Sequence, residues 1–166
     1  MSDPLAGCAE RLAVVEFGFY HLQRTPLEPA LGRLLEKVLA SGQRAVVRAS
    51  SPDRVEALNR ALWTLGQGSF LPHGSRDDGF AEDQPVFLTH QADYPNGATV
   101  LVLVDGVEVE PASQFERCLY LFDGNDEQVV ARAREQWRKW RERGALVTYW
   151  QQTERGWNAT AGAAEA

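Results

Sequence analysis

Arginine and tryptophan side chains concentrate in residues 129–144, VVARAREQWRKWRERG. This segment holds six basic and two acidic residues, so its net charge is +4, which leaves −10 for the rest of a chain whose total is −6. A planar guanidinium binds a carboxylate through two parallel hydrogen bonds, and an adjoining apolar surface can hold a ring. These residue types therefore predict capture of a peptide end that has a hydrophobic side chain and a free carboxylate.

Helical spacing places an apolar stripe and a charged edge side by side in this segment. Four apolar residues recur every three or four positions, which predicts a stripe that packs on the core. Arg134 lies one turn from both Val130 and Arg138, and beside Trp137. Arg141 continues the charged edge, so these five residues form the predicted peptide site. The stripe consists of Val130, Ala133, Trp137 and Trp140.

Three histidines offer the other side chains suited to acid–base chemistry. His21, His73 and His90 each lie at or near a predicted strand end, where a general base could sit. The sequence has neither a GxSxG nucleophile elbow nor an HExxH helix, so neither hydrolase template applies. Local hydrogen bonding is the simpler interpretation of all three, and no catalytic residue is predicted.

Nucleotide and metal sites lack their usual sequence signals. The only lysines, Lys37 and Lys139, do not follow glycine as in a phosphate-binding loop, and the junction after the first predicted strand reads HLQRTPLEP, without glycine. The pair Gly66 and Gly68 follows a helix instead. The acidic residues Asp105, Glu108 and Glu110 indicate a solvated loop, because metal binding needs converging ligands that spacing alone does not supply. We therefore expect no cofactor and no bound metal.

Composition predicts a single globular domain. The chain has 166 residues, 44% of them hydrophobic, and a pI near 5.1, which argues against a protein that coats DNA. Cys8 and Cys118 form no CxxC motif, which fits a reducing compartment. The first residues lack the apolar core of a signal peptide, and no run of 18 apolar residues predicts a membrane span. A cytoplasmic location is expected.

Strand and helix signals alternate along the chain. Helices are predicted at residues 26–41, at 51–65 with Ser51 as N-cap and Pro52 next to it, and at 126–143, capped by Asp123 or Asn125. A short helix is expected near 112–116, a loop at 66–84 and a turn at 94–97. Strands are predicted at 13–20, 43–49, 85–90, 99–104, 117–122 and 145–150.

This alternation predicts an α/β fold with parallel crossovers. The expected architecture is a three-layer, Rossmann-like sandwich: a mainly parallel sheet with helices on both faces. One domain is expected over residues 1–151. Residues 152–166 are aperiodic and are predicted to form a flexible tail.

Several pieces of the sequence together resemble the chi subunit of bacterial DNA polymerase III holoenzyme. The resemblance covers about residues 17–150, and ALWTLGQGSFLPHG is its most specific piece, because no general rule of folding demands it. The other pieces are FYHL at the end of the first strand, SGQRAVV, the LFDGND turn, and ARAREQWRKWRERG followed by a strand.

The resemblance implies a non-catalytic adaptor with a Rossmann-like fold. Chi subunits bind the psi subunit, which ties them to the clamp loader, and the acidic C-terminal tail of single-stranded DNA-binding protein, which ends in an aromatic residue. DNA is then contacted mainly indirectly. The family's main anchor for the tail falls on Arg134, with Trp137 and Arg138 close by and Phe70 matching a family aromatic near that surface.

The chain also departs from the family pattern. Val130 stands where some relatives have a lysine, so one basic contact with the tail is missing, and Trp137 replaces a smaller aromatic. The loop at 73–84 is acidic and would repel an acidic tail if it came close to it. Two alternatives stay open: a small enzyme with its substrate at the carboxyl ends of the strands, and direct binding of single-stranded DNA through Trp137 or Trp140.

Overall fold

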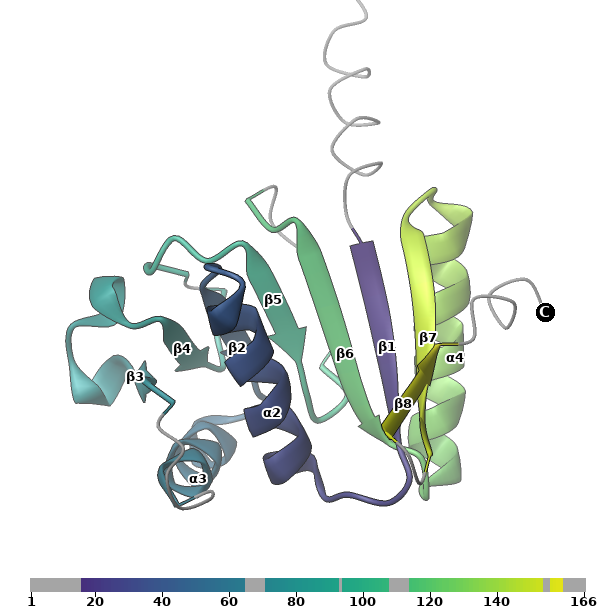
Figure 1. Ribbon diagram of the computed structural model, residues 1–166, viewed down its shortest axis with the longest axis horizontal. Coiled ribbons are helices and arrows are strands. Elements are labelled where there is room, and N and C mark those ends of the chain that lie inside the picture. Colours follow the sequence, from purple (N-terminus) through teal and green to yellow (C-terminus); the bar gives the residue numbers. More distant parts are fainter. Residues whose placement is uncertain (1–15, 65–70, 93, 108–113, 154–155, 160–166) are drawn as a thin grey trace, which may run out of the picture.

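The chain folds around one eight-stranded sheet with helices on both faces (Figure 1). The computed structural model describes residues 16–64, 71–92, 94–107, 114–153 and 156–159. The strand order is β3-β4-β2-β5-β6-β1-β7-β8, and every neighbouring pair is parallel except β7 and β8. The predicted three-layer, mainly parallel α/β architecture is confirmed. No helix of the described residues is long and apolar enough to cross a bilayer.

The bounds of the elements fit the predicted order. The helices are α2 (Leu27–Ala40), α3 (Pro52–Trp63) and α4 (Glu127–Glu142), with two single-turn 3₁₀ helices at Arg76–Asp78 and Ala81–Asp83. The strands are β1 (Glu16–Leu22), β2 (Ala45–Arg48), β3 (Gly74–Ser75), β4 (Val86–Thr89), β5 (Val100–Leu103), β6 (Arg117–Asp123), β7 (Leu146–Thr153) and β8 (Gly156–Ala159).

Side-chain caps fix the starts of two of the helices. The Ser51 side chain accepts the Arg54 N–H, which confirms the predicted N-cap of α3. Helix α4 is capped by Asp126, whose carboxylate accepts the N–H groups of Gln128 and Val129, so Asp123 and Asn125 were wrong as candidates. The helix starts later because the tight turn at 123–125 comes first.

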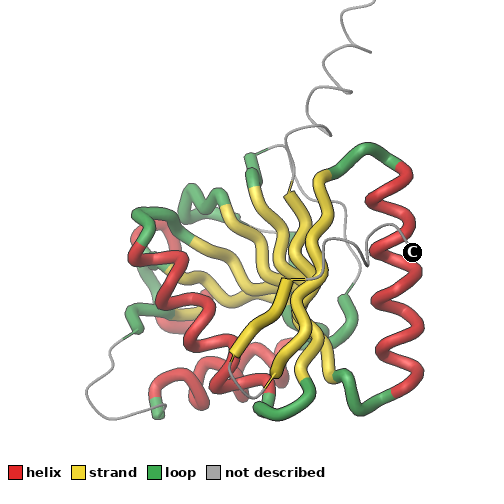
Figure 2. The backbone as a smooth tube through the Cα atoms, turned by 45° about the vertical axis from the view of Figure 1, so that its right-hand side comes forward, coloured by secondary structure: helices red, strands yellow, loops and turns green. Residues whose placement is uncertain are grey.

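Each face of the sheet has its own hydrophobic core. Helices α2 and α3 pack on one face, over Tyr20 of β1 and the alternate residues of β2 and β5. Helix α4 covers the other face, where Phe17 stacks on Trp140 with ring centroids 4.4 Å apart and 22° between the planes. In Figure 2, α4 stands apart from the other two helices. Strand β1 is central to this arrangement because its alternate side chains enter both cores.

Some short or irregular elements differ from the predictions. Strand β3 and the two 3₁₀ turns lie in the segment predicted as a loop, because two-residue pairings leave no periodicity to detect. Strand β7 reaches Thr153 and β8 follows it antiparallel, so part of the segment predicted as tail forms a hairpin. The predicted short helix at 112–116 lies partly outside the described residues, and residues 114–116 are not helical.

Candidate functional site

Helix α4 presents two edges that flank its buried stripe. Ala133, Trp137 and Trp140 are buried against the sheet, as the spacing predicted. Successive residues of a helix are turned by about 100°, so the predicted site residues share one edge of α4 and Arg132 lies on the other. We call the first of these the β7 edge; it consists of Val130, Arg134, Arg138 and Arg141.

The charge of Arg134 shows which strands this edge faces. Burial lowers the pKa of His21 in β1 and raises the pKa of Tyr149 in β7, and in both cases the Arg134 guanidinium also acts on the group, which places its charge near these two side chains. Arg132, by contrast, lies near Gly106 in the turn after β5. Its Nη1 is 3.5 Å from the position that a β-carbon on Gly106 would take. The two edges therefore face different parts of the sheet: β1 and β7 on one side and the turn after β5 on the other.

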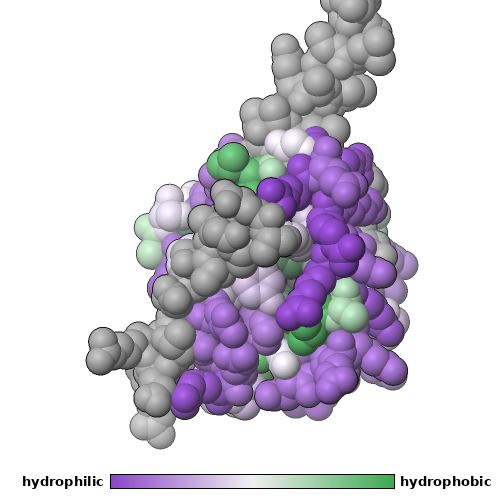
Figure 3. Space-filling view, turned by 90° about the vertical axis from the view of Figure 1, so that its right-hand side faces the viewer, coloured by the Kyte–Doolittle hydropathy of each residue, from purple (hydrophilic) through white to green (hydrophobic). Residues whose placement is uncertain are grey.

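Arg134 is available to a ligand. Its side chain is exposed, and within the described part of the chain no hydrogen bond or ion pair holds its guanidinium. Arg138 and Arg141 are exposed as well, so the β7 edge carries three guanidinium groups. Figure 3, which faces the side where α4 lies, shows a largely hydrophilic surface interrupted by small hydrophobic areas.

Trp137 contributes less surface than its position in the sequence suggested. Its side chain is only 7% exposed, and its buried Nε1 has no hydrogen-bond partner among the described residues. The Arg141 guanidinium lies 5.4 Å from the centroid of its ring, in cation–π range. The indole thus serves mainly to seat α4 on the sheet and offers a ligand little more than an edge.

An aromatic cluster beside Arg134 was not foreseen from the sequence. The rings of His21, Phe122 and Tyr149 lie with centroids 5.0 to 6.1 Å apart, and the Nδ1 of His21 is 2.6 Å from the Tyr149 hydroxyl. Strand alternation could have put His21 and Tyr149 on the α4 face, but their pairing depends on β7 lying next to β1. Val130 packs against the same core.

Burial keeps this cluster uncharged. Desolvation lowers the pKa of His21; the Gly124 backbone opposes this shift, Arg134 adds to it and Asp123 opposes it. Desolvation likewise raises the pKa of Tyr149, although Arg134 partly offsets the effect. A neutral imidazole and a neutral phenol therefore share one hydrogen bond, and Arg134 is the positive charge beside them.

Gly124 makes room for His21. A β-carbon at this position would come within 2.0 Å of Cδ2 and Nε2 of the His21 ring and 2.7 Å of the Leu22 carbonyl oxygen. The Gly124 N–H donates to that carbonyl oxygen at 2.6 Å. The LFDGND turn thus needs glycine because the imidazole fills the space beside it.

Within the described ranges, the other histidines and the acidic residues show no comparable arrangement. Both ring nitrogens of His73 lie within hydrogen-bond distance of backbone carbonyl oxygens: Nδ1 is 2.6 Å from that of Leu71 and Nε2 is 3.0 Å from that of Asn59. His73 therefore holds a loop in place. His90 is half-buried at the end of β4. In the ranges that the structure describes, no three His, Cys, Asp or Glu side chains gather as a metal site. Phe70, Glu108 and Glu110 lie outside the described residues.

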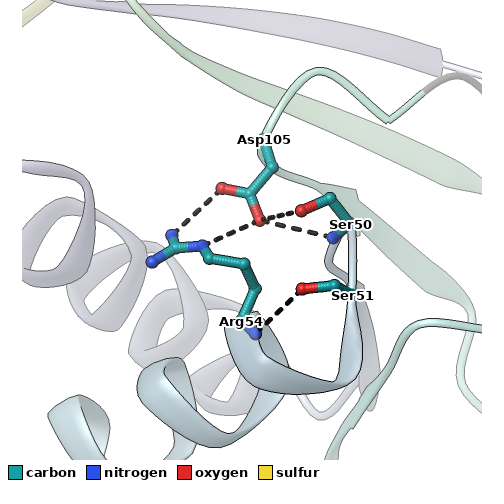
Figure 4. Close-up of polar contacts among 4 residues, drawn as sticks. All are labelled: Ser50, Ser51, Arg54 and Asp105. Atoms are coloured by element: carbon teal, nitrogen blue, oxygen red, sulfur yellow. Dashed lines mark hydrogen bonds and ion pairs between the residues drawn. The ribbon is translucent and has the colours of Figure 1, made fainter.

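A cavity of about 660 Å³ lies at the carboxyl ends of the strands, where Rossmann-like folds bind nucleotides. The carboxylate of Asp105 lies here and accepts hydrogen bonds from the Ser50 N–H and Oγ, both at 3.3 Å (Figure 4). It also accepts from Nε and Nη2 of Arg54, at 3.1 and 3.0 Å. A carboxylate therefore lies inside this cavity, next to the N-terminus of α3, where it disfavours a second anion.

Fold and surface together define the class of protein: a Rossmann-like α/β domain whose sheet is covered on one face by a cationic helix. The family model described as "DNA polymerase III chi subunit, HolC" matches residues 15–148, and the chain belongs to this family. A probable DNA polymerase III subunit chi from Rickettsia prowazekii (strain Madrid E) is 31% identical over 107 residues. That match spans 64% of this chain and 65% of the relative's length.

Proposed function

We propose that this chain is a non-catalytic adaptor subunit of the DNA polymerase III holoenzyme in the cytoplasm. It connects the clamp loader, through the psi subunit, to the acidic C-terminal tail of single-stranded DNA-binding protein. Membership of the chi family supports the place in replication. The observation that carries the tail site is Arg134: an exposed guanidinium with no acidic partner in the described chain, beside the neutral His21–Tyr149 pair.

The β7 edge of α4 suits such a tail in both charge and polarity. Arg134 binds the terminal carboxylate, while Arg138 and Arg141 attract the acidic residues that precede it. Val130 and the Tyr149 ring provide the apolar contact for the terminal aromatic side chain, in place of the covered Trp137. One charge-assisted pair contributes roughly 1.5–3 kcal/mol and one buried ring about the same, so these two contacts together supply roughly 3–6 kcal/mol, which corresponds to dissociation constants from millimolar to some tens of micromolar.

The alternatives have less support from the geometry. Bases cannot stack on Trp137 or Trp140 in the folded protein, because these side chains are only 7% and 2% exposed. A nucleotide would bind in the cavity at the carboxyl ends of the strands, where Asp105 already provides a carboxylate, and the β1–α2 junction, where a Rossmann-like fold places the phosphate, has no glycine. We therefore expect the chain to bind its partners without transforming a substrate.

Calorimetric titration tests the tail site. The ligand is a short acidic peptide that ends in phenylalanine with a free carboxylate, and the same peptide with an amidated end is the control. Arg134→Ala is expected to lose about 1.5–3 kcal/mol of binding free energy, as is the amidated peptide with the unaltered protein. Arg132→Ala removes the same charge from the opposite edge of α4 and is the matched control, with a loss below about 0.5 kcal/mol.

Unchanged affinity in Arg134→Ala would place the tail elsewhere on the molecule. Equal losses in Arg134→Ala and Arg132→Ala would mean that the peptide responds only to net charge. Co-purification with psi tests the second partner separately, and it should be insensitive to Arg134→Ala because that substitution alters only the tail site.

A further inference from the structure

A second cavity lies on the opposite side of the sheet from α4, between α2 and β7. Its volume is about 630 Å³, within the range of small-ligand sites. In Figure 1, α2 lies in front of the sheet and α4 behind it, which leaves the front of β1 and β7 without a helix of the described chain. Parallel strands are normally covered on both faces, so a strip of sheet that no described helix covers is unusual.

Among the described residues, three cationic side chains and no acidic one line this cavity. Arg33 and Lys37 are exposed one turn apart on α2, and neither side chain makes an ion pair or hydrogen bond within the described residues. Arg117 faces them from β6; its Nε lies 3.8 Å from a carboxylate oxygen of Glu16, at the limit of an ion pair. The cavity is therefore locally positive on a chain with a net charge of −6.

Stacked aromatic rings form part of the wall of the cavity. Tyr20 and Trp150 lie on neighbouring strands with ring centroids 6.0 Å apart and only 7° between their planes. Trp150 is half-buried and lines the cavity with Leu121, so part of its indole is accessible from the groove. This arrangement differs from α4, where both tryptophans are buried.

We propose that this groove binds single-stranded nucleic acid. Its backbone follows α2, with successive phosphates on Arg33 and Lys37 and a third on Arg117, while a base stacks on Trp150. Cationic grooves with an accessible aromatic ring are the usual means of binding single strands without sequence preference. One helical turn, about 5.4 Å, suits the separation of neighbouring phosphates on an extended strand.

The position of the groove favours a nucleic acid over an acidic peptide. The groove lies on the face of the sheet, so its strands offer no free N–H or C=O groups for pairing with a peptide backbone. A ligand must bind here through charge and ring contacts, and a single strand supplies both. Family membership is consistent with this ligand, because the family consists of subunits of a DNA polymerase.

Fluorescence anisotropy with a labelled oligothymidylate of about eight nucleotides tests the proposal. The double substitution Arg33→Ala with Lys37→Ala preserves helix propensity and is expected to weaken binding about tenfold at low salt. It should also reduce the slope of log affinity against log salt by about 1.4, since each phosphate contact on a single strand contributes about 0.7. Quenching of tryptophan emission on binding should decrease in Trp150→Leu.

The matched control is Arg132→Ala with Lys139→Ala, which makes the same change in net charge on α4 and should leave oligonucleotide binding within about twofold. The proposal is overturned if the unaltered chain does not bind the oligonucleotide. It is also overturned if the two double variants lose the same amount of affinity for the oligonucleotide. It is also overturned if oligoglutamate of the same length competes as well as the oligonucleotide. The affinity of the Arg33/Lys37 variant for the tail peptide should be unchanged, so this test and the test of the tail site can give independent results.

Discussion

Gln152 fastens the loop between β1 and α2 to strand β7, and its replacement by alanine should measurably destabilise the fold. The side-chain oxygen of Gln152 accepts three successive backbone N–H groups, from Gln23 at 3.0 Å, Arg24 at 2.7 Å and Thr25 at 3.0 Å. Its Nε2 donates to the Thr25 hydroxyl at 2.6 Å. Gln152 is also the first residue of the segment predicted as a flexible tail, so these bonds bear on where the folded domain ends.

The expected cost follows from these four hydrogen bonds. A typical internal hydrogen bond contributes about 0.5–1.5 kcal/mol net. Gln23 and Arg24 are exposed, so water can take the place of the hydrogen bonds that their N–H groups lose in the variant. Gln152→Ala should therefore lower the free energy of unfolding by about 2 kcal/mol. For a domain of this size the melting temperature should fall by roughly 4–8 °C.

Urea and thermal unfolding followed by circular dichroism provide the measurement. Gln151→Ala is the matched control: it alters the neighbouring residue of β7, which faces the other side of the sheet, and should cost less than about 0.5 kcal/mol. If Gln152→Ala and Gln151→Ala unfold at the same urea concentration, the hydrogen bonds of Gln152 are not what holds the loop, and the reasoning is refuted.

Gln152→Glu provides a second check through pH. Three converging N–H groups favour a carboxylate, so the pKa of this glutamate should be lowered in the folded state. Its stabilising contribution should then be complete above the unfolded pKa of about 4.3 and should disappear as the pH falls through the lower folded value. A variant whose stability relative to the unaltered protein does not change between pH 7 and pH 3 would contradict this account.

Three further predictions concern the core around the α4 face. Gly124→Ala should lower the free energy of unfolding by about 1–3 kcal/mol, because its β-carbon overlaps the His21 ring; the double variant with His21→Ala should recover part of that loss in a urea-based double-mutant cycle. The lowered pKa of His21 means that folding stability should fall as the pH drops below about 6.5, until the folded pKa is reached; His21→Leu should lack this slope, which unfolding at several pH values will show. Burial raises the pKa of the Cys118 thiol, so peptide mapping after iodoacetamide treatment should find this residue unmodified in the folded chain and modified in urea; equal labelling in both would contradict its burial.

Sequence periodicity predicted the long helices and strands well, because each helix buries one apolar stripe and each central strand buries both of its faces. The apolar residues of α2 and α3, the buried run of β5 and the stripe of α4 each identified an element of the right type. The capping residue of α4 and the two-residue strand β3 were missed, because a turn of three residues or a pairing of two residues leaves no repeat in the sequence.

The sequence also predicted one feature of the candidate site and misjudged another. The pattern of residues 129–144 placed Arg134, Arg138 and Arg141 along one edge of a helix, since helical geometry alone determines which side chains are neighbours. It overestimated the accessible surface of Trp137, because the same spacing that aligns an indole with the arginines also turns it toward the sheet.

By itself, the sequence determined the α/β class, the order of its helices and long strands and the cationic edge of α4, because these depend on contacts between residues close in the chain. Only the tertiary structure decided that β7 lies beside β1. That adjacency joins His21 to Tyr149, places Gln152 on the β1–α2 loop, and brings Trp150 onto Tyr20 beside the groove of α2. These pairs are separated by some 130 residues, and a pairing across such a distance is determined by how the whole sheet closes and not by any local pattern.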